Sequence, residues 1–308
     1  MWIPITLVAA VCQTLRTAAQ QRLRSTFSVN GAGFVRFAFG APFAVAAVAI
    51  VAVRCGAPAL PGRFWLTVCG AGVAQILGTN ALIHSFGLRS FAIGTVYAKT
   101  EVVQVGVLSW LLLGEPLHPL AWVGAAVVLA GVVILTLSRT TPSSGPNPGG
   151  TGRRLLQTLA AVRDPAALFG ILAGGLFGLA AVWIRASSNS LGEHPAVVRA
   201  LVTLAVMNTI QTGLQGAYLV ARQPGELRLA RIHWRRAVPV GGLSVLGSAG
   251  WAWAMTIQNA AVVRTVGQVE LLLTFTVSAL WLHERHPRRD YAASALVLVG
   301  VIIVMVVG

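Results

Sequence analysis

The sequence is short of charged residues, and above all of acidic ones. Only 10% of its 308 residues are charged, and just eight are Asp or Glu, whereas an average soluble domain carries about 25% charged residues. Hydrophobic residues make up 56% of the chain, and its mean hydropathy is +0.76. This composition excludes an ordinary soluble domain and predicts membrane helices, each of which needs roughly 20 apolar residues.

Patterns typical of catalysis, nucleotide binding and metal binding are also missing. The three cysteines, Cys12, Cys55 and Cys69, lack the spacing of a metal site and are interpreted as packing residues. The sequence has no Walker loop, zinc motif or Ser/His/Asp arrangement, and Asp164 and Asp290 both lie at loop edges. We therefore predict a protein that is not an enzyme and uses neither a metal nor a cofactor.

Positive charge is abundant, with a formal net charge of +15 that comes from arginines and the single lysine, Lys99. Most arginines fall in short loops between apolar segments, where they act as orientation signals, and no soluble domain presents a basic surface. Nucleic acid is therefore excluded as a partner, and the lipid bilayer is expected instead. Fifteen loop arginines are expected on one side of the membrane and at most four on the other. Because the arginine-rich side is normally cytoplasmic, the termini, which lie on the other side, are predicted to be extracytoplasmic.

Apolar segments of the length of a membrane span follow one another along the chain. Because these runs are long and apolar on all sides, an all-α polytopic membrane fold of about ten transmembrane helices is expected rather than a β-barrel. The expected spans are 3–20, 31–53, 64–87, 91–113, 119–138, 166–185, 197–220, 238–259, 261–282 and 291–307.

A segment rich in Pro, Gly and Ser divides these spans into two groups of five. Residues 139–165 cannot sustain a helix through Thr141 to Gly150 and are predicted to form a flexible cytoplasmic linker. The expected units are a first half, residues 1–138, and a second half, residues 166–308. An odd number of spans in each half would invert the second against the first, and such inverted repeats bind substrates near the midplane of the bilayer.

The two halves align weakly, mainly at a constant spacing of 169 residues. The matched pairs at this spacing are Arg16 and Arg185, Glu101 and Glu270, Ser109 and Ser278, and Glu115 and Glu284. Glu115 and Glu284, at the ends of their spans, are expected to be solvated caps. In the sixth span, Gly170, Gly174 and Gly178 form a ridge of small residues that predicts close helix packing, with a sliding surface as the alternative.

Glu101 and Glu270 are expected near the middle of the fourth and ninth spans. An ionisable group in hydrocarbon costs roughly 3 kcal/mol on insertion scales, so it seldom persists without a function or a partner. One interpretation is a pair of midplane carboxylates that bind a proton or a cationic group, because a low dielectric favours the neutral form of a carboxyl. The other is a structural ion pair with Lys99, Arg36, Arg199 or Arg264.

Helical spacing places Tyr97 and Gln104 on the same face as Glu101. Lys99 lies about 200° round the helix from Glu101, so it either lines the site from another direction or pairs with a neighbouring helix. Gln268 is its counterpart before Glu270. The site is therefore predicted to be two-sided, with Glu101 contacting the substrate and Glu270 carrying a proton or serving as a structural mate.

Arg36 and Arg199 lie a turn or two into the second span of each half. They either anchor helix ends or hold a glutamate or an anionic group of the substrate, and both readings stay open. Further candidates for lining a cavity, with packing as the alternative, are Gln13, His84, Trp251 and Trp253.

These residues resemble the drug/metabolite transporter superfamily, in its ten-span EamA-type branch. The resemblance covers essentially the whole chain, and its marks are the paired halves, Arg36 and Arg199, Leu111 to Glu115, Gly124 to Gly131, Trp281 to Glu284, and Gly300. Two features depart from it. Many relatives carry proline or a small residue near Glu101 and Glu270, and they are usually drawn with cytoplasmic termini, whereas the arginine count predicts the reverse.

The resemblance implies a secondary-active permease of the bacterial inner (plasma) membrane. It would move a small metabolite, an amino-acid-like compound or a drug by alternating access, as in efflux. Transport could be coupled to protons through Glu101 and Glu270. The alternatives are an uncoupled facilitator in which the glutamates are structural, and a channel or membrane-embedded enzyme. A monomer is sufficient, because both halves lie in one chain, and a homodimer is compatible with the sequence.

Overall fold

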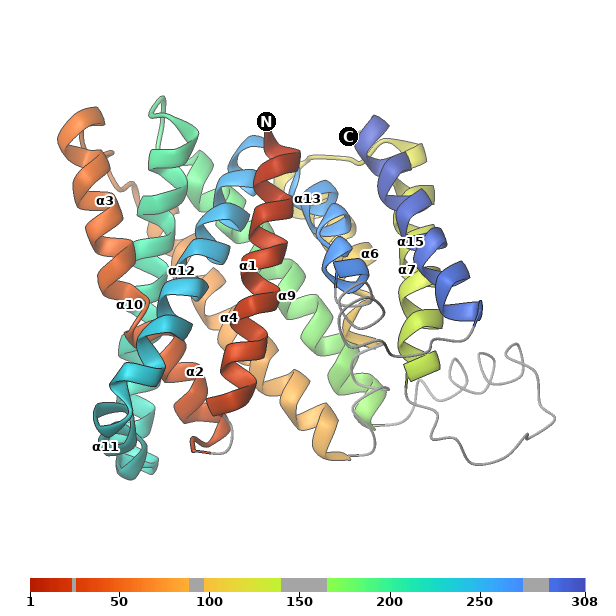
Figure 1. Ribbon diagram of the computed structural model, residues 1–308. Helices are drawn as coiled ribbons and strands as arrows, with labels where there is room; N and C mark the ends of the chain where they lie inside the picture. Colours follow the sequence, from red (N-terminus) through yellow and green to blue (C-terminus); the bar gives the residue numbers. More distant parts are fainter. Residues whose placement is uncertain (24–25, 89–96, 140–164, 274–287, 308) are drawn as a thin grey trace.

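All regular secondary structure in the part of the chain that the structure describes is helical. This computed structural model describes residues 1–23, 26–88, 97–139, 165–273 and 288–307. Figure 1 shows the helices, which are α1 (Trp2–Leu23), α2 (Val29–Ala38), α3 (Ala41–Cys55), α4 (Gly62–Leu88), α6 (Glu101–Leu113), α7 (Pro119–Arg139), α9 (Pro165–Asn189), α10 (Ala196–Arg222), α11 (Pro224–Ile232), α12 (Trp234–Ile257), α13 (Ala260–Val266) and α15 (Arg288–Val307).

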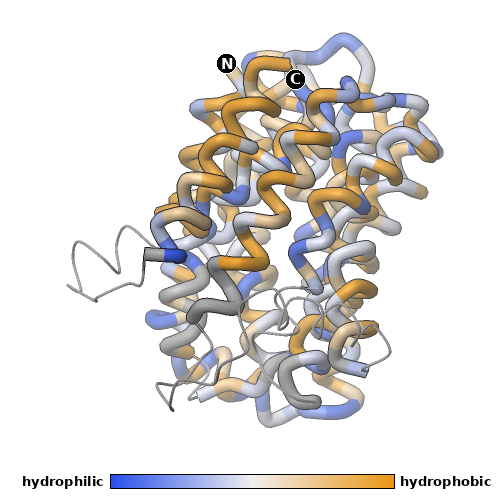
Figure 2. The backbone as a smooth tube through the Cα atoms, turned by 90° about the vertical axis from the view of Figure 1, so that its right-hand side faces the viewer, coloured by the Kyte–Doolittle hydropathy of each residue, from blue (hydrophilic) through white to orange (hydrophobic). Residues whose placement is uncertain are grey.

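The helices have the length and the outer surface of a polytopic membrane protein. Six segments are long and apolar enough to cross a membrane, and three shorter apolar helices accompany them among the described residues. Large apolar side chains face outward, as at Leu66, Val53 and Val306, which are 76%, 88% and 79% exposed. Figure 2 shows hydrophobic residues along most of the length of the helices. The all-α membrane fold is confirmed, whereas the count of ten spans stays a prediction.

The second expected span consists of two helices. Helix α2 ends at Ala38 and α3 begins at Ala41, so Gly40 lies at the joint. A Cβ atom on Gly40 would lie 2.8 Å from the Arg36 carbonyl oxygen and 3.3 Å from that of Gly241 in α12. Only glycine fits where two backbones approach so closely. The sequence analysis missed this joint because the contact that requires it comes from a helix far along the chain.

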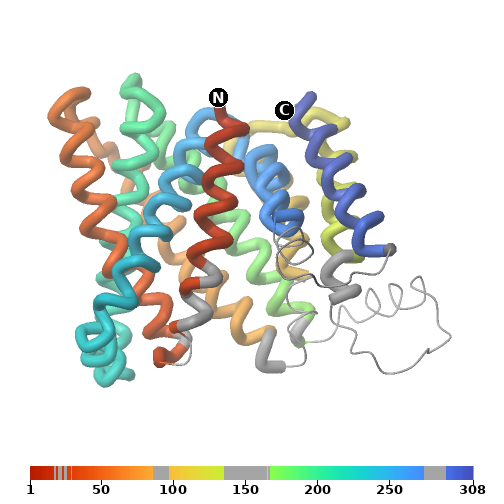
Figure 3. The backbone as a smooth tube through the Cα atoms, in the orientation of Figure 1, coloured from red at the N-terminus to blue at the C-terminus, as the bar shows by residue number. Residues whose placement is uncertain are grey.

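Helices of the two halves pack in pairs around the centre. The main contacts join α1 to α12, α4 to α9, and α7 to α15. Each pair contains one helix from each half, and an exchange of the two halves would map the α1–α12 pair onto the α4–α9 pair. Figure 3 shows that the two termini lie at the same end of the molecule. The described part of the centre of the molecule is thus enclosed by helices from both halves.

Glycines permit the closest helix contacts, as the ridge in the sixth span predicts. A Cβ atom on Gly174 of α9 would lie 2.8 Å from the Ala98 carbonyl oxygen, and one on Gly178 would lie 3.3 Å from the Val105 nitrogen. In the α7–α15 pair, a Cβ atom on Gly300 would lie 2.7 Å from the Gly124 carbonyl oxygen. Small residues therefore bring helix backbones together, as is common in membrane bundles.

The structure also contains a helix that the sequence analysis did not predict. Helix α11 occupies the connection between α10 and α12 and lies at the end of the molecule opposite the termini (Figure 1). Its Glu226 accepts a hydrogen bond from the Ser28 backbone nitrogen at 3.1 Å, and Ser28 itself caps α2. The predicted linker is a different case, because residues 140–164 lie outside the described part of the chain.

Candidate functional site

Glu101 lies at the start of a helix rather than in the middle of one. Residues 97–98 are helical, Lys99 and Thr100 form a turn, and α6 begins at Glu101. The Thr100 nitrogen donates to the Tyr97 carbonyl oxygen at 3.2 Å, and the Val103 nitrogen donates to the Thr100 oxygen at 3.0 Å. These tight contacts interrupt the α-helical pattern. The regular helical spacing expected around Glu101 is therefore interrupted at residues 99–100.

A second break precedes Glu270. Helix α13 ends at Val266, residues 267 and 268 form a turn, and residues 269–273 are helical again. A Cβ atom on Gly267 would lie only 2.1 Å from the Trp251 ring, so glycine allows the tryptophan to pack against this break. Both glutamates thus lie near the N-terminus of a helical segment, where the helix dipole favours a negative charge.

Each glutamate forms an ion pair with a cation from the other half of the chain. Arg264 Nε lies 2.6 Å from Glu101 Oε1, and the guanidinium contacts the same carboxylate through a second nitrogen. Lys99 Nζ lies 2.9 Å from Glu270 Oε1, and Gln13 Nε2 donates to Glu270 Oε2 at 2.7 Å. The pairs therefore link the two halves reciprocally at the centre of the molecule.

A small cavity of about 60 Å³ lies beside these ion pairs. Its polar lining includes Gln13 and Arg264, which bind the two glutamates, together with Arg36, Gln75 and Trp251. Binding sites for drug-sized ligands usually enclose about 300–1,000 Å³. The cavity is therefore too small for such a ligand, and binding would require the surrounding helices to separate.

The polar groups of the cavity are held by contacts from several helices. Arg36 of α2 donates from Nε to the Ser244 hydroxyl of α12 at 2.9 Å. The Arg264 guanidinium lies over the Trp251 ring, 5.2 Å from its centroid. The rest of the lining consists mainly of apolar residues, which include Phe177, Ile184, Leu204, Met207 and Met255, together with the hydroxyl residues Thr203 and Ser248. The cavity lining therefore combines cationic and apolar groups.

The structure brings some of the predicted site residues together and places others elsewhere. Glu101, Glu270, Lys99 and Arg36 lie in or beside the central cluster. Gln268 is adjacent and donates to the Arg264 carbonyl oxygen at 3.3 Å. Buried Tyr97 precedes the first break, and its carbonyl oxygen accepts from the Thr100 hydroxyl at 2.6 Å.

Three predicted site residues point away from the cavity. Gln104 donates to the Thr100 hydroxyl at 2.7 Å and the Ile171 carbonyl oxygen at 3.3 Å, so it links α6 to α9. Arg199 donates to Asn189 at 3.0 Å near one end of α9. Trp253 lies in a separate apolar groove between α1, α10 and α12, whereas Trp251 lines the cavity.

The sequence analysis understated the importance of Arg264. It was one of four alternative ion-pair partners, whereas the structure makes it the partner of Glu101, with its side chain 19% exposed, and a residue that lines the cavity. Its position between Ala260 and Val266, in an otherwise mostly apolar stretch, was the available signal. The break at Gly267 could not be inferred from that stretch, because the Trp251 ring that fills it comes from another helix.

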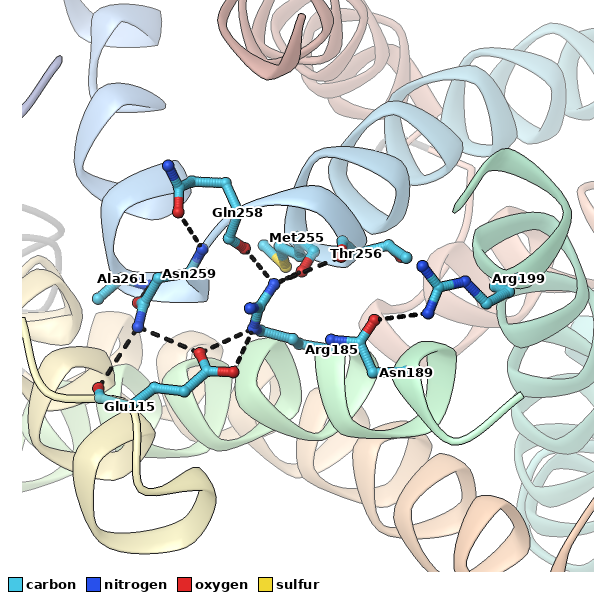
Figure 4. Close-up of polar contacts among 9 residues, drawn as sticks. All are labelled: Glu115, Arg185, Asn189, Arg199, Met255, Thr256, Gln258, Asn259 and Ala261. Carbon is cyan, nitrogen blue, oxygen red and sulfur yellow. Dashed lines mark hydrogen bonds and ion pairs between the residues drawn. The ribbon is translucent and has the colours of Figure 1, made fainter. Parts of the chain in front are cut away.

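A second polar cluster joins the two halves at the end of the molecule where the termini lie. Figure 4 shows Arg185 of α9 between Glu115 and the end of α12. Arg185 Nε lies 2.8 Å from Glu115 Oε2, and its Nη1 donates to the carbonyl oxygens of Met255 and Gln258 at 2.6 and 2.7 Å. We call Glu115, Arg185, Gln258 and Asn259 the latch. Glu115 is therefore an ion-pair partner and not the solvated cap that was expected.

The latch also fixes the start of α13. Asn259 donates from its side-chain nitrogen to Glu115 Oε2 at 3.2 Å and accepts from the Ala261 nitrogen at 2.8 Å. It thereby caps the helix that carries Arg264. The latch and the central ion pairs are thus connected through α13, which carries Arg264, and through α6, which runs from Glu101 to just before Glu115.

Comparison with known proteins supports the resemblance that the motifs indicate. Residues 1–137 match the EamA-like transporter family. A Sinorhizobium protein described as an uncharacterized transporter in the cobO 3' region is 31% identical over 78 residues, which are 25% of this chain and 55% of that protein. The chain thus spans about half the length of this curated relative.

The fold has a counterpart among solved structures. One, described only as the crystal structure of a protein, superimposes with a TM-score of 0.73 at 16% sequence identity. The superposition covers 99% of this chain and 96% of the other. At this identity the likeness concerns the fold alone.

Proposed function

We propose that this chain, whose residues 1–137 match the EamA-like transporter family, is a secondary transporter of small organic molecules in the bacterial inner membrane. The observation that carries the proposal is the central cavity, which lies among apolar helices of both halves and is lined by both polar and apolar groups. Substrates of transporters built from repeats bind near the midplane, where the halves meet. A cavity lined by helices of both halves supports such a site here.

Transport by alternating access requires the helices around the cavity to separate at one end of the molecule while they close at the other. The latch supports this proposal, because it ties α9 to the α12–α13 junction and to Glu115 at a single end. The helix pairs α1–α12 and α4–α9 support it too, since they are the pairs that two inverted repeats would form. Opening that end would break the Arg185–Glu115 ion pair.

The proposal can be tested by locking the latch. In a background without Cys12, Cys55 and Cys69, the Glu115→Cys/Arg185→Cys variant would be cross-linked and reconstituted into liposomes. Uptake from a defined metabolite mixture, measured by mass spectrometry, should stop on cross-linking and return on reduction. The single variants Glu115→Cys and Arg185→Cys serve as controls. Treatment with the cross-linking reagent should leave both of them active.

Two outcomes of this experiment contradict different parts of the proposal. Equal uptake by the cross-linked and reduced protein would contradict alternating access through the latch. If no compound entered the reduced proteoliposomes faster than protein-free liposomes, the transporter function itself would be refuted.

An uncoupled facilitator is the second candidate, and the ion pairs favour it. Both glutamates are already paired with cations, so a proton would have to displace Lys99 or Arg264. Coupling through Glu101 and Glu270 predicts that an imposed pH gradient drives accumulation and that Glu101→Gln and Glu270→Gln abolish it. Equal accumulation with and without the gradient would instead establish the facilitator.

A further inference from the structure

Among the described residues, the centre of the molecule contains more cations than anions. Four basic residues, Arg16, Arg36, Lys99 and Arg264, lie in or beside the central cluster, together with Glu101 and Glu270. Lys99 and Arg264 are compensated by the two glutamates. Arg16 and Arg36 form no ion pair with another described residue, and they lie close enough for their charges to repel each other.

Arg36 is the uncompensated cation that lines the cavity. Its Nε donates to the neutral Ser244 hydroxyl, and no other hydrogen bond from its side chain to a described residue is present. Arg16 is near Glu270 and Arg264 but does not line the cavity, and its Nε is buried without a hydrogen-bond acceptor among the described residues. Buried cations without a counter-charge are costly, so an anion that reached Arg36 would be favoured.

The remaining lining restricts the kind of anion. Leu204, Met207 and Met255 form an apolar wall, and Trp251 offers an aromatic surface that Arg264 already covers on one face. A strongly hydrated inorganic ion would leave this wall without a partner. A carboxylate attached to an apolar body matches both the cationic and the apolar lining residues, because guanidinium geometry suits a carboxylate.

We infer that the central cavity binds a small organic monocarboxylate, with its carboxylate on Arg36 and its apolar body against the wall formed by Leu204, Met207 and Met255. This inference rests on the proposed transport function only in treating the cavity as the substrate site. Cationic compounds are rejected by the excess positive charge. The cavity widens on binding, because about 60 Å³ does not hold such a molecule.

Binding can be tested on the purified full-length chain in detergent with isosteric probes. A series of carboxylates from acetate through benzoate to 3-phenylpropionate would be compared with the matching amides and amines, and with inorganic phosphate. Melting temperature would be followed against ligand concentration. At least one carboxylate should stabilise the protein at about 10-fold lower concentration than its amide, the factor expected from one charge-assisted hydrogen bond. The amines should have no effect.

Arg199 provides the matched control for Arg36. The two arginines occupy equivalent places in the two halves of the sequence, yet Arg199 binds Asn189 outside the cavity. Arg36→Gln should abolish the preference for carboxylate over amide, and Arg199→Gln should leave it intact. Arg36→Lys keeps the charge and should retain part of the preference, which provides a second measurement if Arg36→Gln does not fold.

Several results would overturn the inference. The inference fails if amides or amines stabilise the protein at the same concentrations as carboxylates, or if phosphate stabilises it more than any carboxylate does. It also fails if no carboxylate in the series stabilises the protein, or if Arg36→Gln and Arg199→Gln lose the preference for carboxylate equally. Because binding is measured without transport, failure here leaves the latch experiment to decide the function. Carboxylate binding by a protein that transports nothing would conversely refute only the proposed function.

Discussion

Glu101 and Glu270 occupy equivalent places in the sequence but different surroundings in the structure. The Glu101 side chain is 7% exposed and is held by two nitrogens of Arg264. The Glu270 side chain is 20% exposed and shares its charge between Lys99 and the amide of Gln13. A guanidinium fork binds a carboxylate more rigidly than an ammonium group does. The Glu101–Arg264 pair is therefore expected to stabilise the contact between the two halves more strongly than the Glu270–Lys99 pair does.

Replacement of Glu101 should expose this difference. Glu101→Gln leaves the Arg264 charge unpaired among packed helices, and loss of one partner of a buried pair costs about 3–5 kcal/mol of unfolding free energy. Glu270→Gln should cost less, because its pair is more exposed. Reversible unfolding in mixed detergent measures both values.

A double variant provides the control for that experiment. Glu101→Gln/Arg264→Gln removes both charges and should recover part of the stability lost in Glu101→Gln alone. Equal losses in the two single glutamate variants, or no recovery in the double variant, would show that the pairs are not the source of the effect.

The identity of these charged residues could be read from the sequence, but their partners could not. Glutamates in apolar segments are conspicuous, and the analysis named Lys99 and Arg264 among four alternative partners. The reciprocal choice of Lys99 for Glu270 and Arg264 for Glu101 depends on how two distant segments face each other. No local spacing encodes that arrangement.

At the scale of the helices, the breaks decide where the charged groups point. The turns at residues 99–100 and 267–268 divide what would otherwise be continuous spans, and each places a glutamate just beyond the interruption. Discontinuous helices are a recurrent means of presenting polar groups at the membrane midplane. Of the expected spans 91–113 and 261–282, the structure describes residues 97–113 and 261–273. Periodicity could not reveal the breaks within them, because these depend on packing against other helices.

Gly267 should be essential for the second break. In Gly267→Ala, the new methyl group would lie 2.1 Å from the Trp251 ring, so either the ring or the turn must move, at a cost of about 1–3 kcal/mol. The melting temperature of the purified protein should fall accordingly. Displacement of Trp251 should also loosen the contact with Arg264.

Gly242 in α12 is the matched control for this substitution. A Cβ atom there would meet nothing within 4 Å, so Gly242→Ala should be neutral or stabilise the helix by up to about 1 kcal/mol. If both variants melt at the temperature of the unmodified protein, the packing role of Gly267 is wrong.

At the scale of the whole molecule, the latch and the termini lie at one end and α11 lies at the other (Figure 1). The arginine count predicts that the end with the termini is extracytoplasmic. The native Cys55 is exposed at the end of α3, on the side of the termini. It therefore offers a natural reporter of orientation.

Labelling of intact cells should test this orientation. With Cys12 and Cys69 replaced by Ala, a membrane-impermeant maleimide should label Cys55 from outside, because the positive-inside rule places the arginine-poor side there. Arg231→Cys on α11, in a background that also lacks Cys55, should react only after permeabilisation. The reverse pattern would show that the arginine count misassigns the orientation.

The sequence by itself determined the membrane environment, the helical class and the position of the costly charges. Those properties follow from composition and from the length of apolar runs, which act locally along the chain. Only the tertiary structure decided that Arg36 lines the cavity while its sequence mate Arg199 does not, that Glu115 belongs to a latch, and that the glutamates pair across the halves. These outcomes arise from contacts between helices far apart in the chain, where close packing selects one partner among several of equal chemistry.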